Sequence, residues 1–210
     1  MSDFVAEDNS HYSRPEWWDN EYKKCGENDK YEWFSGGDDK NMLSAIISTI
    51  PSKESKIINL GCGISHIQDY LYDHGYKCIT NVDVSESCIG IMKNGDTRGM
   101  DWAVVDVLKP FPYENGYFDF ALDKGTLDAL ITDQADQWDI EDEVYQVSDA
   151  YFQNVYNSLS HGGVFIQITF GQPHFRKRLF ERESFQWDVS VQTITSEHSF
   201  HFYCYVCTKH

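Results

Sequence analysis

The feature that most constrains the fold is the regular alternation of short apolar segments with amphipathic ones along most of the chain. Segments typical of strands cover residues 56–60, 78–82, 102–105, 118–122, 164–170, 185–194 and 200–208. Apolar residues recur at helical spacing in residues 41–50, 64–74, 85–93 and 144–159. Strands that alternate with helices predict a mostly parallel sheet with helices on both faces, and the last two segments predict an antiparallel hairpin. The expected fold is therefore α/β, with a Rossmann-like sheet of seven strands.

The length of the chain predicts one domain, because 210 residues can bury a core without disulfides or metals. We expect residues 1–12, which are acidic, to form a flexible arm and residues 13–210 to form the domain. In that domain, residues 13–50 hold an aromatic-rich lid segment and a helix, and residues 51–210 hold the sheet core. No signal peptide and no run of about 18 apolar residues is evident, so we expect a cytoplasmic protein that does not span a membrane. A monomer is favoured, although the sequence does not determine the oligomeric state.

The charge of the chain predicts what it does not bind. It has 17 Lys and Arg residues against 34 Asp and Glu residues, a formal charge of −17. Such a charge repels nucleic acid and anionic membranes and attracts basic partners, although surface acid also serves solubility alone. One stretch without Lys or Arg contains Asp133, Asp136, Asp139, Glu141, Asp142, Glu143 and Asp149. It is either a contact for a basic protein or a solvated loop.

Small and acidic residues follow the first three predicted strands. In open α/β sheets, ligands bind beyond the carboxyl ends of the strands. Gly61 and Gly63 follow the first strand and allow the backbone to approach a ligand closely. Asp83 ends the second strand and can accept hydrogen bonds from two ribose hydroxyls, while Asp106 ends the third and can accept one from an adenine amino group. The combination predicts a site for a nucleoside cofactor.

The residues around the glycines narrow the identity of that cofactor. The dinucleotide fingerprint places a third glycine where His66 stands, and Ile64 and Ser65 are bulky for a pyrophosphate. S-adenosylmethionine carries no phosphate, and its sulfonium cation suits aromatic faces. We therefore expect S-adenosylmethionine in this site.

Several motifs carry a specific resemblance. They are residues 59–65 (NLGCGIS), 81–85 (NVDVS), 122–130 (LDKGTLDAL), 18–22 (WDNEY), 31–34 (YEWF), 173–176 (PHFR) and 200–202 (FHF). Together these residues resemble the seven-stranded, class I S-adenosylmethionine-dependent methyltransferases that modify lysines of translation elongation factor 1-alpha. The similarity runs from about Tyr12 to Lys209. It implies methyl transfer to a lysine side chain of a basic protein substrate, elongation factor 1-alpha.

The resemblance also implies a set of cofactor residues. Transferred by position, they are Trp18, Tyr22, Tyr31, Gly61, Asp83, Val84, Asp106, Val107 and Lys124, and the residue pattern adds Gly63. The aromatic members have an alternative role in ordinary core packing. Asn59 departs from the acidic residue that many such enzymes carry, and an amide cannot pair with the ammonium of the cofactor. Residues 130–138 belong to a variable region, so substrate choice is not transferred there.

Two carboxylates that follow the fourth strand are candidate catalytic residues. Asp123 and Asp128 are candidates for positioning an acceptor lysine, and their alternative role is to cap a helix around Thr126. The fourth strand is not followed by an Asn/Asp-Pro-Pro-aromatic motif, which argues against DNA as the substrate. A small-molecule methyltransferase and a cofactor-binding but catalytically idle partner protein remain as alternatives.

No metal site is expected. Cys204 and Cys207 have the spacing of zinc or redox pairs. The run around them is typical of a strand, in which residues three apart point to opposite faces. A second pair of ligands with zinc-finger spacing is missing as well.

Overall fold

The computed structural model describes residues 4–26, 29, 31–132, 142–197 and 201–210. One sheet of seven strands has the order β3-β2-β1-β4-β5-β7-β6. The strands are β1 Ile57–Leu60, β2 Ile79–Asp83, β3 Asp101–Val104, β4 Phe118–Lys124, β5 Leu159–Thr169, β6 Trp187–Thr195 and β7 His201–Lys209. The first five pair in parallel, whereas β7 pairs antiparallel with both β5 and β6. The expected Rossmann-like sheet with a C-terminal hairpin is confirmed.

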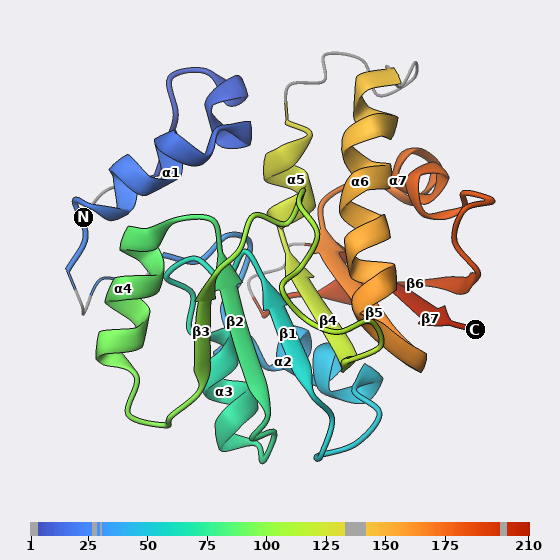
Figure 1. The fold of residues 1–210 in the computed structure, drawn as a ribbon, viewed down its shortest axis with the longest axis horizontal. Helices are drawn as coiled ribbons and strands as arrows, with labels where there is room; N and C mark the ends of the chain where they lie inside the picture. The colour runs from blue at the N-terminus through green and yellow to red at the C-terminus, as the bar shows by residue number, and fades with distance from the viewer. Residues whose placement is uncertain (1–3, 27–28, 30, 133–141, 198–200) are drawn as a thin grey trace.

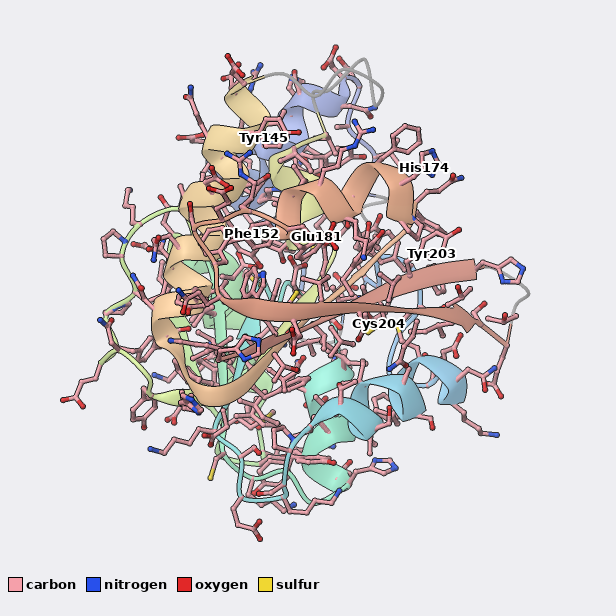
Figure 2. The ribbon with its side chains drawn as sticks, turned by 90° about the vertical axis from the view of Figure 1, so that its right-hand side faces the viewer. Tyr145, Phe152, His174, Glu181, Tyr203 and Cys204 are labelled. Atoms are coloured by element: carbon pink, nitrogen blue, oxygen red, sulfur yellow. The ribbon has the colours of Figure 1, made fainter. Side chains whose placement is uncertain are left out.

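Helices cover both faces of this sheet. They are η1 Asn9–Ser13, a 3-10 helix, α1 Pro15–Tyr22, α2 Lys40–Thr49, α3 Ile67–Asp73, α4 Glu86–Gly95, α5 Thr126–Leu130, α6 Asp142–Ser158 and α7 Pro173–Phe180. Figure 2 shows α7 on one side of β6 and β7, with α2 and α3 on the other. Phe152 of α6 packs in the core of the first face, and Met42 of α2 packs in the core of the second. Cys207 belongs to the first core and Cys204 to the second, as a strand requires.

Two of the element boundaries that differ from the predicted ones bear on the site. The helix predicted from residue 64 begins only at Ile67, because Gly61 and Gly63 adopt positive φ and the chain turns before it winds. The fourth strand runs on through Lys124, so that Asp123 lies within the sheet, paired with Leu60 and Gln167 of the neighbouring strands. At α4, Ser85 caps the helix by accepting a hydrogen bond from the Cys88 N–H, as predicted.

The start of the chain packs against the domain. Phe4 is 2% exposed, and its ring lies 4.5 Å from that of Tyr31 and 5.3 Å from that of Tyr22. The Tyr12 hydroxyl donates to the Phe4 carbonyl and accepts from the Ala6 N–H. The expectation of a loose arm therefore does not hold for residues 4–12. Burial of one phenylalanine, worth about 1.5–3 kcal/mol, outweighs the polar composition around it.

The segment with η1 and α1 lies across one end of the sheet (Figure 1). Helix α1 contacts α4, and η1 contacts α5. The Thr132 hydroxyl, just after α5, donates to the Asn9 carbonyl. In the described part of the chain, no helix is both long and apolar enough to cross a membrane. Residues 133–141, which hold part of the acidic stretch, lie outside the described residues.

Candidate functional site

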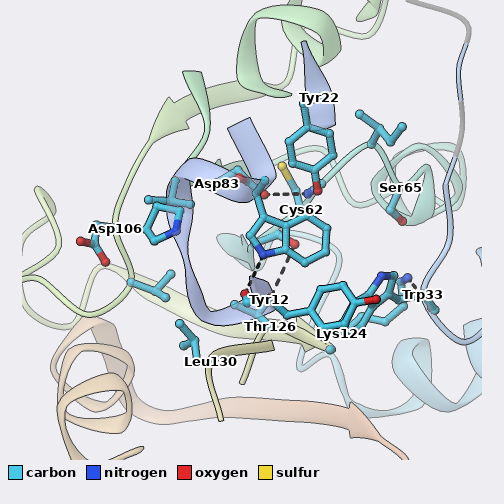
Figure 3. Close-up of a pocket in the computed structure, with 18 of the residues that line it drawn as sticks. Tyr12, Tyr22, Trp33, Cys62, Ser65, Asp83, Asp106, Lys124, Thr126 and Leu130 are labelled. Atoms are coloured by element: carbon cyan, nitrogen blue, oxygen red, sulfur yellow. Dashed lines mark hydrogen bonds between the residues drawn. The ribbon is translucent and has the colours of Figure 1, made fainter. Parts of the chain in front are cut away.

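A pocket lies between the strand ends and the N-terminal segment. Its volume is about 980 Å³, including space open to solvent. All the residues predicted to bind the cofactor line it, namely Trp18, Tyr22, Tyr31, Gly61, Gly63, Asp83, Val84, Asp106, Val107 and Lys124. Figure 3 labels four of them, Tyr22, Asp83, Asp106 and Lys124, around the pocket. The chain thus brings together residues that lie up to 106 positions apart, from Trp18 to Lys124.

The glycines after β1 allow α1 and α5 to approach the backbone of this turn closely. A Cβ on Gly63 would lie 2.9 Å from the Tyr22 hydroxyl oxygen, and a Cβ on Gly61 would lie 2.2 Å from Thr126 Oγ1. Both residues also have positive φ, which L side chains disfavour. The turn therefore has glycines because α1 and α5 approach its backbone closely.

Asp83 is presented at the end of β2 as a buried carboxylate. It is 6% exposed and accepts hydrogen bonds from the N–H groups of Gly63 and Ser85, each at 3.0 Å. Burial raises its pKa, although the backbone hydrogen bonds oppose that change. Each oxygen keeps a lone pair for a ligand, so that the carboxylate can accept two further hydrogen bonds.

Asp106 contributes a second, more accessible carboxylate beyond β3. One of its oxygens accepts from the Leu108 N–H at 3.0 Å, and the other pairs with Lys109 at 3.0 Å. The two carboxylates thus differ in burial along one wall of the pocket. They can accept from different polar groups of a nucleoside.

Aromatic rings form the opposite wall. The ring of Trp18 lies 5.8 Å from that of Tyr22, and its Nε1 donates to the Tyr12 carbonyl at 2.8 Å. Tyr12 and Trp33 also line the pocket, but sequence reasoning missed them as site residues. Trp33 lies within the YEWF motif, so a signal for it was present, whereas Tyr12 falls in the segment taken as a loose arm.

The buried Trp33 Nε1 has no acceptor among the described residues. A buried N–H without an acceptor is costly, and a ligand that carries oxygen or nitrogen acceptors would satisfy it. An adenosine with an amino-acid tail carries such acceptors. The residues present therefore fit S-adenosylmethionine.

Lys124 ties the aromatic segment to the sheet. Its Nζ lies 2.9 Å from Glu32 Oε2 and 2.9 Å from the Trp33 carbonyl oxygen. The other oxygen of Glu32 accepts from the His66 N–H at 2.9 Å, beside the start of α3. Lys124 uses two of its three protons in these contacts, which leaves one for a ligand carboxylate.

Asp123 does not line the pocket. It is fully buried and accepts from the N–H groups of Thr126 and Leu127 and from the Tyr151 hydroxyl. Burial, with a smaller contribution from Asp128, raises its pKa to about 7. These contacts agree with the alternative role, in which Asp123 satisfies the first N–H groups of α5.

Asp128 is likewise absent from the pocket. It accepts from the Thr169 hydroxyl at 2.7 Å and forms an ion pair with Arg176. These contacts join α5 to β5 and α7. The described contacts of Asp123 and Asp128 are structural, and a role in positioning the acceptor lysine stays a prediction.

Asn59 also lies apart from the pocket lining. It is buried on β1, and its amide donates to Gln68 Oε1 at 3.3 Å and to Asn81 Oδ1 at 3.1 Å. The amide thus belongs to a buried polar network between β1, β2 and α3. A carboxylate here would bury a charge among these amides, which is costly.

Comparisons with known proteins identify the family of this chain. A family model described as a methyltransferase domain matches residues 58–166. EEF1A lysine methyltransferase 4 of Mus musculus is 32% identical over 201 residues, covering 95% of this chain and 77% of that protein. The eEF1A lysine and N-terminal methyltransferase of Danio rerio is 30% identical, over 94% of this chain and 28% of that protein.

A solved structure shows the same fold. The 1,6-didemethyltoxoflavin-N1-methyltransferase of Burkholderia thailandensis, solved with S-adenosylhomocysteine, has a TM-score of 0.56 at 17% identity, covering 82% of this chain and 79% of that one. The family model spans about half of the chain, and the mouse relative spans nearly all of it. This chain therefore belongs to the methyltransferase domain family and is an S-adenosylmethionine-dependent methyltransferase.

Proposed function

We propose that this enzyme transfers a methyl group to the ε-amino group of a lysine in a protein, and that translation elongation factor 1-alpha is its substrate. The observation that carries the proposal is the similarity to EEF1A lysine methyltransferase 4 along 95% of the chain. It includes the N-terminal aromatic segment as well as the sheet. The formal charge of −17 agrees with a basic protein as the substrate.

The pocket offers a role for each part of the cofactor. We assign Asp83 to the ribose hydroxyls and Asp106 to the adenine amino group, since carboxylates accept from such donors. Lys124, with one proton free, is assigned to the carboxylate of the amino-acid tail. Val84 and Val107, beside the two carboxylates, supply apolar contact to the nucleoside.

Methyl transfer from a sulfonium requires little acid or base catalysis by the protein. When bound, the cofactor supplies an electrophilic methyl group on a sulfonium whose leaving group is neutral. The residues of the pocket hold the two reactants in line and exclude water. An acceptor lysine has an ordinary pKa of about 10.4, and its burial beside the positively charged sulfonium would lower that pKa by disfavouring the charged amine. The amine thus loses its proton to solvent, without a dedicated base.

The proposed methylation of a lysine in elongation factor 1-alpha is tested by mass spectrometry of labelled products. The purified enzyme is incubated with isotopically labelled S-adenosylmethionine and either purified elongation factor 1-alpha or a cell extract. We expect label on one lysine of the elongation factor, and less label with an Asp83→Ala enzyme at a limiting concentration of S-adenosylmethionine. Label on a small molecule in the extract would favour the small-molecule alternative, and the absence of any label would favour an idle partner protein.

Two predictions from the sequence belong to the same proposal. A substrate of the translation machinery implies a cytoplasmic enzyme. A monomer remains the expected state, which light scattering of the purified chain measures.

A further inference from the structure

Three ligand-type side chains converge behind the wall of the pocket. The two Sγ atoms of Cys62 and Cys88 and one carboxylate oxygen of Asp83 lie within 4.8 Å of one another. Cys62 belongs to the glycine turn after β1, Asp83 ends β2, and Cys88 lies in the first turn of α4. All three are buried. The described residues hold no second group of three such ligands.

Hydrogen bonds hold the Asp83 carboxylate and the backbone of Cys88 in place. Asp83 is fixed by the N–H groups of Gly63 and Ser85, and the Cys88 N–H donates to Ser85 Oγ at 3.1 Å. Around a tetrahedral zinc ion, bond lengths of about 2.3 Å to sulfur and 2.0–2.2 Å to oxygen place the donors about 3.5–3.8 Å apart. The donor atoms, which lie within 4.8 Å of one another, would reach these separations if the side chains moved by about 1 Å.

The charges around Asp83 favour a cation. The partners of Asp83 are backbone N–H groups, and the charged side chain that acts on it is another acid, Asp19. Asp19 is linked to the cluster because it accepts from the Ser85 hydroxyl at 2.7 Å. A divalent ion would supply the positive charge that buried acids require. Thiolates prefer soft ions such as Zn²⁺ and Cd²⁺.

The cluster is open toward the cofactor pocket on one side. Cys62 and Asp83 line the pocket, whereas Cys88 lies behind them. An ion would therefore enter through the pocket and complete its coordination with water there. It would also engage the carboxylate that we assign to the cofactor ribose.

We propose that Cys62, Asp83 and Cys88 form a site for a thiophilic divalent cation, and that its occupancy excludes S-adenosylmethionine. The inference rests on the proposed cofactor role of Asp83. Binding of one divalent ion to two thiols and one carboxylate releases two protons and leaves the complex with one negative charge. The enzyme would then be inhibited by Zn²⁺ or Cd²⁺ at the cofactor site itself.

Cadmium titration of the metal-free, cofactor-free protein tests the site, because thiolate-to-cadmium charge transfer absorbs in the ultraviolet. We expect saturation at one equivalent. Cys62→Ser and Cys88→Ser should each weaken binding at least tenfold, since even supporting groups of metal sites contribute about 10–100-fold. Cys78→Ser, at an exposed thiol, is the matched control and should bind as the parent does. A Cys88→Ser protein with parental cadmium affinity would overturn the site.

Exclusion of the cofactor is measured separately with S-adenosylhomocysteine, which cannot react. Saturating S-adenosylhomocysteine should suppress the charge-transfer signal, and Cd²⁺ should raise its apparent Kd in proportion to the cadmium concentration. Simultaneous, independent binding of both would refute the exclusion. Calorimetry without metal tests the cofactor assignment alone. If S-adenosylhomocysteine does not bind to the metal-free protein, the proposed cofactor role of Asp83 is wrong. The cadmium titration would still test the metal site independently. Thermal unfolding checks each variant, and Cys88→Ala replaces Cys88→Ser if the latter does not fold.

Discussion

At the scale of single residues, neighbours in the sequence have opposite roles. Asp123 and Lys124 are consecutive on β4, and their side chains leave the strand on opposite faces. Lys124 lines the pocket, whereas Asp123 is enclosed beneath α5 and α6 with Tyr151. Asp83 combines both roles, because it supports the turn at Gly63 and also faces the pocket.

The first prediction concerns Asp83. Two charge-assisted hydrogen bonds to a ribose contribute about 1.5–3 kcal/mol each, though not additively, so Asp83→Ala should weaken cofactor binding at least about tenfold. Calorimetry with S-adenosylhomocysteine measures the effect. Asp73→Ala, at an exposed carboxylate paired with Arg98, is the control and should bind normally. Unchanged affinity in a folded Asp83→Ala protein would remove Asp83 from the site.

The second prediction concerns the pH dependence of stability at Asp123. Its pKa is raised by burial from 3.8 to about 7 in the folded state, so the folded protein holds a proton that the unfolded chain loses. The stabilisation is complete below pH 3.8 and is lost as the pH rises to about 7, by up to about 1.4 kcal/mol per unit. Asp123→Asn removes this titration. Denaturant unfolding across that range should therefore show the parent losing stability relative to the variant, and parallel curves would contradict the assignment.

At the scale of elements, the N-terminal segment is a wall of the site that is held at several points. Glu32 joins it to Lys124 and to the His66 N–H, and Phe4 packs beneath its aromatic rings. From the sequence, deletion of residues 1–12 should do little. The packing of Phe4 and the pocket position of Tyr12 change that expectation.

We expect removal of residues 1–12 to weaken binding of S-adenosylhomocysteine several-fold. The wall residue Tyr12 is lost, and so is Phe4, whose ring packs against three rings of the wall, those of Trp18, Tyr22 and Tyr31. Removal of residues 1–35 should abolish it, while the sheet core, which starts near Lys56, still folds. Circular dichroism and calorimetry on both truncations make the comparison. Parental affinity in the longer truncation would show that the aromatic segment serves packing alone.

The aromatic wall should also distinguish the cofactor from its product. Aromatic faces attract a sulfonium by about 0.5–2 kcal/mol, and this attraction is absent for a neutral thioether. The double variant Trp18→Ala and Tyr31→Ala should therefore lose more affinity for S-adenosylmethionine than for S-adenosylhomocysteine. Tyr117→Ala, at an exposed ring away from the pocket, is the control. An equal loss for both ligands would mean that the rings act only by shape.

At the scale of the whole molecule, the acidic charge should act on the protein substrate. Attraction between a chain of charge −17 and a basic partner is long-ranged and screened by salt. Raising the ionic strength from about 0.01 M to about 0.15 M shortens the screening length from about 30 Å to about 8 Å. We expect KM for the protein substrate to rise several-fold over that range, with the Kd of S-adenosylhomocysteine little changed. A KM that does not respond to salt would leave solubility as the role of the charge.

Much of the architecture follows from periodicity alone. The spacing of apolar residues located all seven strands, and the parallel arrangement places the ends of β1, β2 and β3 at one edge. Gly61, Asp83 and Asp106 could thus be assigned to one site without coordinates. Trp18, Tyr22 and Tyr31 could be placed there only through resemblance to a family, because an aromatic residue far upstream carries no signal of where it packs.

Contacts between segments that lie far apart in the sequence could be identified only from the tertiary structure. The sequence predicts a fourth strand that ends at residue 122, two residues before the end of β4. Because both Asp123 and Lys124 belong to β4, Lys124 faces the pocket and Asp123 is buried on the other face. The burial of Phe4 and the meeting of Cys62, Asp83 and Cys88 likewise depend on how loops and helices dock. Local sequence encodes hydrophobic periods and turns, which specify elements and their order. Which side chains meet across those elements depends on register and packing, which are properties of the whole folded chain.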